Sequence, residues 1–249
     1  MIPVKRLRYL WRAYNYRRRA NREEIGFLAG QVRPGDTVVD VGAHKGGFLY
    51  WLRHHVTATG RVYAFEPQPS LAQYLKEVVA MQRWDNVAIE AAGLSSSSGT
   101  MDLYVPADTG AVSPGATLAP TGADVPHYKV RVPVVTLDAY RERRAGHRIA
   151  FVKCDCEGHE LEVFKGARGV LERDRPVLLF ECELRHLRGG SPAAIFEYLQ
   201  ALGYEGWFFH EAGLERVERF RPEIHQPVRE GRYWDAADYY NNFAFLPKA

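Results

Sequence analysis

Short apolar runs rich in β-branched residues alternate with longer segments of helical period along most of this chain. The runs occupy residues 37–41, 61–65, 87–91, 149–154, 177–182, 204–210 and 243–246. Between them, apolar residues recur at the helical spacing of three and four in segments 46–56, 69–83, 158–173 and 191–202. This alternation predicts an α/β fold of Rossmann-like type, with a seven-stranded, mostly parallel sheet covered by helices on both faces.

The N-terminal segment follows a different pattern, with apolar residues at helical spacing among many arginines. Its apolar stripe consists of Val4, Leu7, Trp11 and Tyr14. This spacing predicts an amphipathic helix with arginines on its other faces. We therefore divide the chain into a basic helical extension, residues 1–30, and one domain, residues 31–249.

Residues 106–126 hold four prolines and three glycines without a clear period. We interpret this segment as a long loop and a candidate lid, because such loops inside compact domains often cover or line binding sites. The runs at 100–105 and 128–135, which flank it, alternate well enough to predict strands of an insertion.

The composition is that of a globular protein, with 46% apolar and 25% charged residues in 249 and a net charge of +3. The charge is uneven. Residues 1–22 contain eight Lys and Arg and no acid, so the remainder, with 25 basic and 30 acidic residues, has a net charge of −5. Three cysteines and the lack of about 18 consecutive apolar residues predict a cytoplasmic protein without a disulfide framework.

A glycine-rich string, DVGAHKGG, follows the first predicted strand at Asp40–Gly47. Gly42 and Gly46 permit a tight turn and a close approach of the backbone to a ligand. His44 occupies the second glycine position of GxGxxG, which departs from the dinucleotide fingerprint. S-adenosylmethionine carries no phosphate, so a looser turn suffices for it, with Asp40 placed to take its ammonium group.

Glu66 ends the second predicted strand, 26 residues after Asp40. Its carboxylate is placed to accept both ribose hydroxyls of an adenosine and to repel a 2′-phosphate. Pro67 then turns the chain under the adenine. The alternative is a plain tight turn in which Glu66 caps a helix. Two acids on successive strands favour the cofactor site.

A second string, FVKCDCEGHELEVFKGA at Phe151–Ala167, places Asp155 and Glu157 at the carboxyl end of the fourth predicted strand. Together with DVGAHKG, FEP at Phe65–Pro67, TLDAY at Thr136–Tyr140 and the closing NNFAFLP, it resembles the FkbM family of S-adenosylmethionine-dependent methyltransferases. The resemblance covers roughly residues 35–247. Cys154 and Cys156 depart from it, since aliphatic residues are more usual there.

The resemblance implies a class I methyltransferase fold and O-methylation of a hydroxyl on a small molecule or glycan. Asp155 would lie near the transferred methyl group. The residues expected to hold S-adenosylmethionine are Asp40, Gly42, Ala43, His44, Gly46, Glu66, Pro67, Ala92 and Asp155.

An alcohol is a poor nucleophile without a base, so methyl transfer to it needs a positioned acceptor for its proton. Asp155 is our first candidate for this role, with His159 and Glu181 as alternatives at or just past the strand ends. A structural interpretation exists for each: Asp155 could cap the following helix, and His159 could be solvated in its first turn.

No residue is assigned as a metal ligand. A zinc set of Cys154, Cys156, His159 and Cys182 is conceivable, but the paired CxxC spacing of structural zinc sites is missing. Magnesium held by Asp155 and Glu181 would have suitable oxygen ligands, so a divalent ion stays open as a second cofactor.

Other functions compete with this one. The basic, aromatic N-terminal segment suits a nucleic-acid methyltransferase, but the chain contains no Pro-Pro for an Asn/Asp-Pro-Pro-aromatic motif and its acidic body would repel a polyanion, so no nucleic-acid partner is expected. An NAD-dependent dehydrogenase is the alternative on chemistry. Residues 1–22 could instead rest on an anionic membrane, pack on the domain or fold over the cofactor as a lid.

Overall fold

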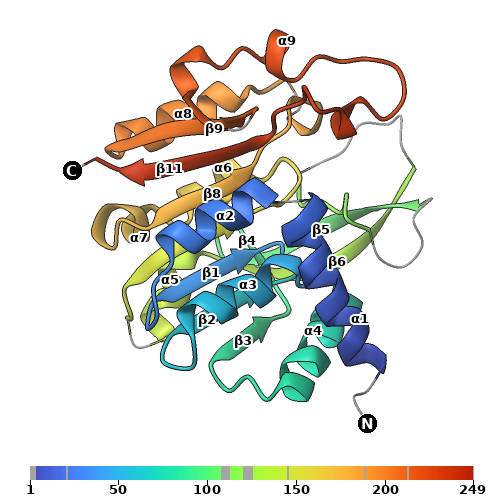
Figure 1. The fold of residues 1–249 in the computed structure, drawn as a ribbon, viewed down its shortest axis with the longest axis vertical. Coiled ribbons are helices and arrows are strands. Elements are labelled where there is room, and N and C mark those ends of the chain that lie inside the picture. The colour runs from blue at the N-terminus through green and yellow to red at the C-terminus, as the bar shows by residue number, and fades with distance from the viewer. Residues whose placement is uncertain are drawn as a thin grey trace.

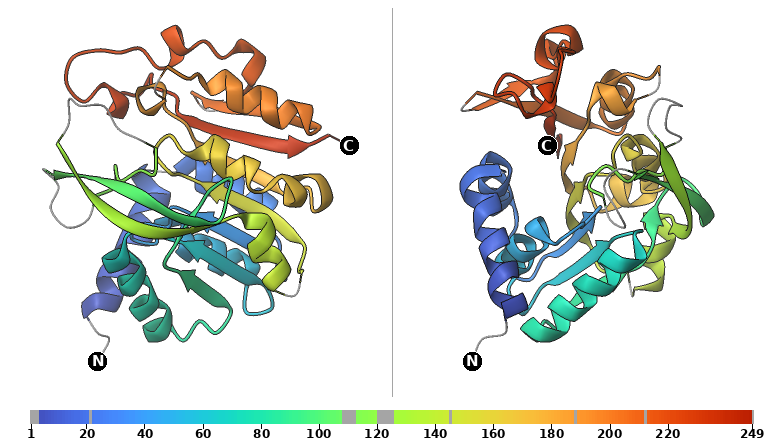
Figure 2. Two further views of the ribbon diagram at one scale, coloured as in Figure 1. Left: turned by 180° about the vertical axis from the view of Figure 1, so that it is seen from behind. Right: turned by 90° about the vertical axis from the view of Figure 1, so that its right-hand side faces the viewer.

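The structure is a computed structural model that describes residues 4–20, 22–107, 113–119, 126–144, 146–187, 189–211 and 213–248. Its centre is an eight-stranded sheet between two layers of helices (Figures 1 and 2). The spatial order is β10 (Gly213–Arg216), β9 (Tyr204–His210), β11 (Asn242–Pro247), β8 (Val177–Glu181), β7 (Ile149–Cys154), β1 (Thr37–Val41), β2 (Arg61–Phe65) and β3 (Val87–Glu90).

The strands from β8 to β3 are parallel, whereas β11 is antiparallel to both of its neighbours. The predicted Rossmann-like α/β fold is thus confirmed. The predicted count of seven strands in this sheet is one too low. After β9, Glu211 adopts a left-handed conformation with φ 50°, and the chain returns as β10 antiparallel to β9.

Helices cover both faces of the sheet. One layer contains α2 (Arg22–Gln31), α3 (Gly47–Val56) and α4 (Pro69–Gln82). The other contains α5 (Leu137–Arg143), α6 (Glu160–Lys165), α7 (Arg168–Arg173) and α8 (Pro192–Ala201). A short helix, α9 (Pro222–His225), lies in the segment that leads to β11. Within the described ranges, no helix combines the length and the apolarity that a membrane crossing requires.

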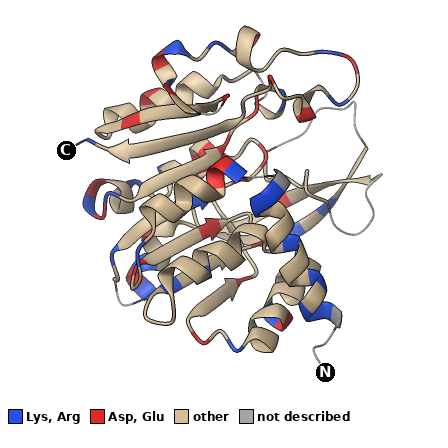
Figure 3. Ribbon diagram, viewed as in Figure 1, with Lys and Arg blue, Asp and Glu red and all other residues tan. Residues whose placement is uncertain are grey.

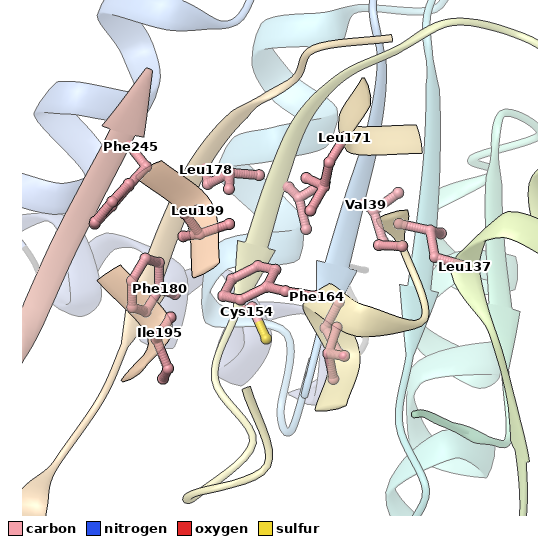
Figure 4. Close-up of a cluster of buried hydrophobic side chains, with 14 of the residues drawn as sticks. Val39, Leu137, Cys154, Phe164, Leu171, Leu178, Phe180, Ile195, Leu199 and Phe245 are labelled. Atoms are coloured by element: carbon pink, nitrogen blue, oxygen red, sulfur yellow. The ribbon is translucent and has the colours of Figure 1, made fainter. Parts of the chain in front are cut away.

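The two cores follow from the alternation of side chains along the buried strands. In β1, Val38 packs in the layer of α3, whereas Val39 packs toward α6 and α7. Neighbouring strands repeat this division, so Phe164 on α6 meets Phe180 of β8 at a ring-centroid distance of 5.2 Å (Figure 4). Apolar side chains on both faces explain why these strands are nearly continuous apolar runs.

The helix predicted at 158–173 is divided in two. Gly166 separates α6 from α7, and a Cβ at this position would lie 2.0 Å from the carbonyl oxygen of Ser95. The carboxylate of Asp138 then accepts the backbone N–H groups of Gly169 and Val170 at 2.9 and 2.8 Å. Asp138 of α5 therefore caps the N-terminus of α7. The helical period of the sequence alone does not reveal this contact.

A small second sheet stands outside the main one. It contains β4 (Gly93–Leu94), β6 (His127–Val135) and β5 (Gly99–Pro106) in that order. The two predicted insertion strands are therefore confirmed, and they form the long antiparallel ribbon seen in Figure 2. The predicted loop at 106–126 joins them, and its residues 108–112 and 120–125 lie outside the described residues.

The N-terminal segment forms α1 (Val4–Asn15), followed by a π-helical turn at Tyr16–Ala20. The predicted helix is correct, but the apolar stripe is not its buried face: Leu7 and Trp11 are exposed, and Tyr14 is half-exposed with its ring edge-on to that of Trp51. Tyr9 and Ala13 are buried instead. The side chain of Val4, the fourth residue of the stripe, lies outside the described residues. A helix stripe shows which residues share a face and not what that face contacts.

Arg141 of α5 and Asp174, the residue that follows α7, form an ion pair with side-chain distances of 2.6 and 2.8 Å. Burial opposes ionisation of Asp174, but its hydrogen bonds from Arg141 and from the N–H of Ile149 lower its pKa. Removing the arginine would leave a buried carboxylate with fewer partners.

We expect Arg141→Met to lower the free energy of unfolding by about 3 kcal/mol, because breaking a buried ion pair leaves a charge uncompensated. Urea titration measures this value. Arg143→Met, at an exposed position of the same helix, is the matched control. Equal stabilities of the two variants would contradict the importance of this pair.

Candidate active site

A cavity of about 260 Å³ opens at the carboxyl ends of β1, β2, β7 and β8. At this point β1 lies between β2 and β7. From β1 the sheet extends through β2 and β3 on one side and through β7 and β8 on the other, so this is the topological switch point of the sheet. The wall of the cavity carries the charged side chains Asp40, Glu66, Lys153, Asp155, Glu157 and Glu181.

Asp40 is fully buried, and neither of its carboxylate oxygens has a hydrogen-bond partner among the described residues. Burial raises its pKa to about 6, although the positive charge of Lys153 opposes this increase. Lys153 is also buried, and its Nζ lies 2.9 Å from Oδ2 of Asp155. Burial opposes the charged lysine, but Asp155 and Asp40 outweigh it and raise the lysine pKa. Asp40 is therefore the carboxylate still lacking a donor.

Glu66 lies at the end of β2, where its carboxylate accepts the backbone N–H of His44 at 2.7 Å and that of Gln68 at 2.9 Å. Burial nevertheless raises its pKa to about 7. Each oxygen keeps a free lone pair for a further donor. The Gln68 side chain exchanges hydrogen bonds with the backbone of Ser113, so the described part of the long loop is attached beside Glu66.

The glycines of the first string are required by the protein's own packing. Gly42 has φ 75°, and a Cβ there would lie 1.8 Å from the backbone oxygen of Asp155. Gly46 has φ 77°, and a Cβ there would approach Leu75 and Tyr9 at 3.0 and 3.1 Å. The first glycine thus lets the ends of β1 and β7 meet, and the second admits helix α1.

Three further carboxylates on the wall are those of Asp155, Glu157 and Glu181. Burial, followed by the charges of Asp155 and Glu157, raises the pKa of Glu181. Oε1 of Glu181 accepts a hydrogen bond from Asn241 Nδ2 at 2.8 Å. Burial also raises the pKa of Glu157, against the opposing effect of His186 at 2.7 Å. Glu181 and Glu157 are therefore stronger proton acceptors than ordinary glutamates once they are ionised.

The structure brings most of the predicted site residues to one cavity. Those on its wall are Asp40, Gly42, Ala43, His44, Glu66, Pro67, Asp155 and Glu181. Gly46 lies beneath it against Tyr9, and the wall includes Gly93 and Leu94 rather than the neighbouring Ala92.

His159 is not among the residues that line this cavity. Its ring nitrogen Nε2 lies 3.0 Å from the hydroxyl of Ser95, and the side chain is buried. The structure therefore separates this alternative base from the site, because the chain turns at Glu157 and Gly158, both with positive φ, before α6 begins. Glu160 holds that turn by accepting the N–H groups of Cys156 and Gly158 at 3.0 and 3.2 Å.

Sequence reasoning missed Lys153 and Tyr16 as wall residues. The signal for Lys153 was available, because it lies two residues before Asp155 and period two along a strand places both on one face. No signal existed for Tyr16, since its place in the wall depends on how α1 docks.

The conceivable zinc ligands Cys154, Cys156, His159 and Cys182 do not form a group of metal-binding atoms in the part of the chain that the structure describes. Among the described residues, only Glu157, Glu183 and His186 bring three metal-binding atoms within 4.8 Å of one another. Glu183 is already held by Arg185 through two hydrogen bonds of 2.5 and 2.9 Å. These residues are therefore accounted for by ion pairs within the protein.

Fold and cavity together define a Rossmann-like protein with a carboxylate-rich pocket at its topological switch point. The model of the FkbM methyltransferase domain matches residues 40–205, and the chain belongs to this family. No curated protein matches the chain significantly.

Solved structures show the same fold. Methyltransferase FkbM from Methylobacillus flagellatus KT has 17% identity and a TM-score of 0.54, and the match covers 98% of this chain and 55% of that one. The present chain thus spans about half of that protein's length. SMU.1697c from Streptococcus mutans, described as a candidate methyltransferase and solved in complex with SAH, has 10% identity and a TM-score of 0.52 over 92% of this chain and 98% of that chain.

The raised pKa of Asp40 predicts a dependence of stability on pH. A carboxyl group whose pKa is higher in the folded state stabilises that state at low pH, and this contribution is lost as the pH rises from about 4 to about 7. Across this range we expect wild type to lose about 2–3 kcal/mol relative to Asp40→Asn, a figure that follows from the size of the pKa change.

Chemical denaturation at a series of pH values measures this difference. Asp85→Asn, at an exposed position, is the matched control. Parallel pH curves for wild type and Asp40→Asn would contradict the buried, unpaired state of this carboxylate.

Proposed function

We propose that this protein transfers a methyl group from S-adenosylmethionine to a hydroxyl of a neutral small molecule or glycan. The observation that carries the proposal is the unpaired carboxylate of Asp40 beside Glu66, on the wall of one cavity at the switch point. Membership of the FkbM methyltransferase domain family supports it.

The residues present fit this cofactor. Asp40 would accept the ammonium group, which supplies the missing donor and favours ionisation of the carboxylate. Glu66 would accept the two ribose hydroxyls with the lone pairs that His44 and Gln68 leave free. When bound, S-adenosylmethionine supplies an already activated methyl group. The protein's tasks are to align the acceptor and to receive its proton.

The charge of the cavity favours this chemistry over the two competing functions. Its wall holds five carboxylates, and Lys153 is the one Lys or Arg side chain among the wall residues described. The pyrophosphate of NAD or the backbone of a nucleic acid would meet repulsion there. Burial lowers the pKa of His44 to about 4, so this turn residue adds no positive charge at neutral pH. A neutral substrate with several hydroxyl groups avoids this repulsion, and its hydroxyls can donate hydrogen bonds to the wall carboxylates.

We assign Glu181 as the base for the acceptor hydroxyl and Asp155 as the group that orients Lys153. Burial raises the pKa of Glu181, so its ionised carboxylate accepts a proton more strongly than an ordinary glutamate does, as a general base requires. Oδ2 of Asp155 lies 2.9 Å from Nζ of Lys153. The positive charge of this lysine partly balances the negative charge of Asp40.

S-adenosylhomocysteine should raise the midpoint of thermal unfolding, whereas NAD should not. Asp40→Asn and Glu66→Gln should each weaken the binding of S-adenosylhomocysteine at least tenfold, roughly the value of one charge-assisted hydrogen bond. Affinity for wild type should increase as the pH rises through 6–7, the range in which the two carboxyls ionise. Calorimetric titration measures these affinities.

Glu172→Gln, at an exposed position, is the control for these binding measurements. Stabilisation by NAD, or full affinity in both site variants, would argue against the cofactor site.

Glu181→Gln should lower kcat by about 10²–10⁴, the usual contribution of a general base, while S-adenosylhomocysteine binds as before. The assay is transfer of a labelled methyl group to a panel of glycans and small polyols, with and without EDTA. Glu223→Gln, on α9, is the control. An unchanged kcat for Glu181→Gln would remove Glu181 from the mechanism without affecting the cofactor assignment.

A further inference from the structure

The outer face of α1 exposes large apolar side chains. Trp11 is 71% exposed, and Leu7 and Tyr14 are each 50% exposed. Their spacing of three and four residues places them on one side of the helix. Exposed apolar residues gathered in this way on one element indicate a contact surface, whereas scattered ones do not.

The orientation of this face is determined by specific contacts on the other side of the helix. The hydroxyl of Tyr9 donates to the backbone oxygen of Gly46 at 3.1 Å, and Arg12 donates to that of Lys45 at 3.3 Å. The indole N–H of Trp51 donates to the backbone oxygen of Ala13 at 2.8 Å. Because these bonds hold α1 on the glycine-rich turn and on α3, Leu7 and Trp11 face solvent in the folded protein.

The charged residues of this segment are all basic. Residues 4–20 contain seven Lys and Arg and no acid, and α1 carries blue stretches but no red in Figure 3. Arg8, Arg17 and Arg18 are exposed, and the guanidinium of Arg17 also lies 4.7 Å from the centre of the Trp51 ring. We define the outer face as Leu7, Arg8, Trp11, Tyr14 and Arg18.

We propose that this outer face binds the surface of an anionic lipid bilayer. A helix lying in the interface plane buries its apolar residues at the boundary of headgroups and acyl chains, and its arginines meet the anionic headgroups. Tryptophan and tyrosine are favoured at this depth because each has an apolar ring and one polar atom. The outer face offers both residue types beside arginine.

Leu7 distinguishes a bilayer from a nucleic acid. Single-stranded nucleic acid binds through aromatic stacking and a basic groove that follows its backbone. A half-exposed leucine has no role in that mode, but it gains free energy when an apolar medium covers it. A bilayer also contacts only the basic face, so the acidic remainder of the chain stays away from it.

The same segment continues into the wall of the cavity. Tyr16 follows α1 directly and lines the cavity, and its ring packs on Gly47, where a Cβ would lie 2.5 Å from it. A bilayer-bound α1 would therefore hold the cavity beside the lipid surface. The membrane contact itself does not depend on which reaction the cavity supports.

Flotation of the full chain with phosphatidylcholine vesicles, with and without phosphatidylglycerol, tests the proposal. Wild type should float only with the anionic vesicles. Leu7→Ser/Trp11→Ser should reduce the bound fraction by about tenfold or more, given the apolar area removed. Arg8→Glu/Arg18→Glu should do the same, since each charge near an anionic surface contributes to binding.

The matched controls are Ile224→Ser, which is 63% exposed, and Arg143→Glu/Arg148→Glu, which alters two exposed arginines elsewhere. Both should float like wild type, and circular dichroism verifies that every variant is folded. Three results would overturn the proposal: no flotation of folded wild type, equal losses in test and control variants, or a single-stranded RNA that binds more tightly than anionic vesicles through the same residues.

Discussion

A buried carboxylate without a donor is the constraint around which this structure is arranged. Asp40 lies at the centre of the sheet, where burial disfavours its charge, and the nearby Lys153 balances it only in part. Lys153 in turn is held by Asp155 at 2.9 Å. This chain of charges depends on β1 and β7 ending side by side, so the parallel sheet is what holds an otherwise costly carboxylate on the wall of the cavity.

The contact between β1 and β7 also explains why glycine occupies position 42. A side chain there would collide with the backbone of Asp155. The turn is therefore tight because two strand ends must meet. The same logic applies to Gly46, whose missing side chain admits Tyr9 of α1. Glycine-rich turns of this kind serve the protein's own packing as much as the approach of a ligand.

Helix α1 has two faces with different roles. Its inner face donates hydrogen bonds to the glycine-rich turn, so the basic extension is part of the structure that shapes the cavity. Its outer face exposes Leu7 and Trp11 beside basic side chains, whereas Tyr14 is half-covered by the ring of Trp51. A single amphipathic segment thus lies between the cavity and an exposed surface.

The sequence by itself determined the alternation of strands and helices, the Rossmann-like class, the insertion strands and the acids Asp40 and Glu66 as a pair on successive strand ends. These follow from local periodicity and from the rule that parallel strands end at one edge. Only the tertiary structure decided that Leu7 and Trp11 face outward, that His159 turns away from the cavity, and that Tyr16 joins its wall. Each of these depends on contacts between segments far apart in the chain, and no local pattern records which surface a residue will meet.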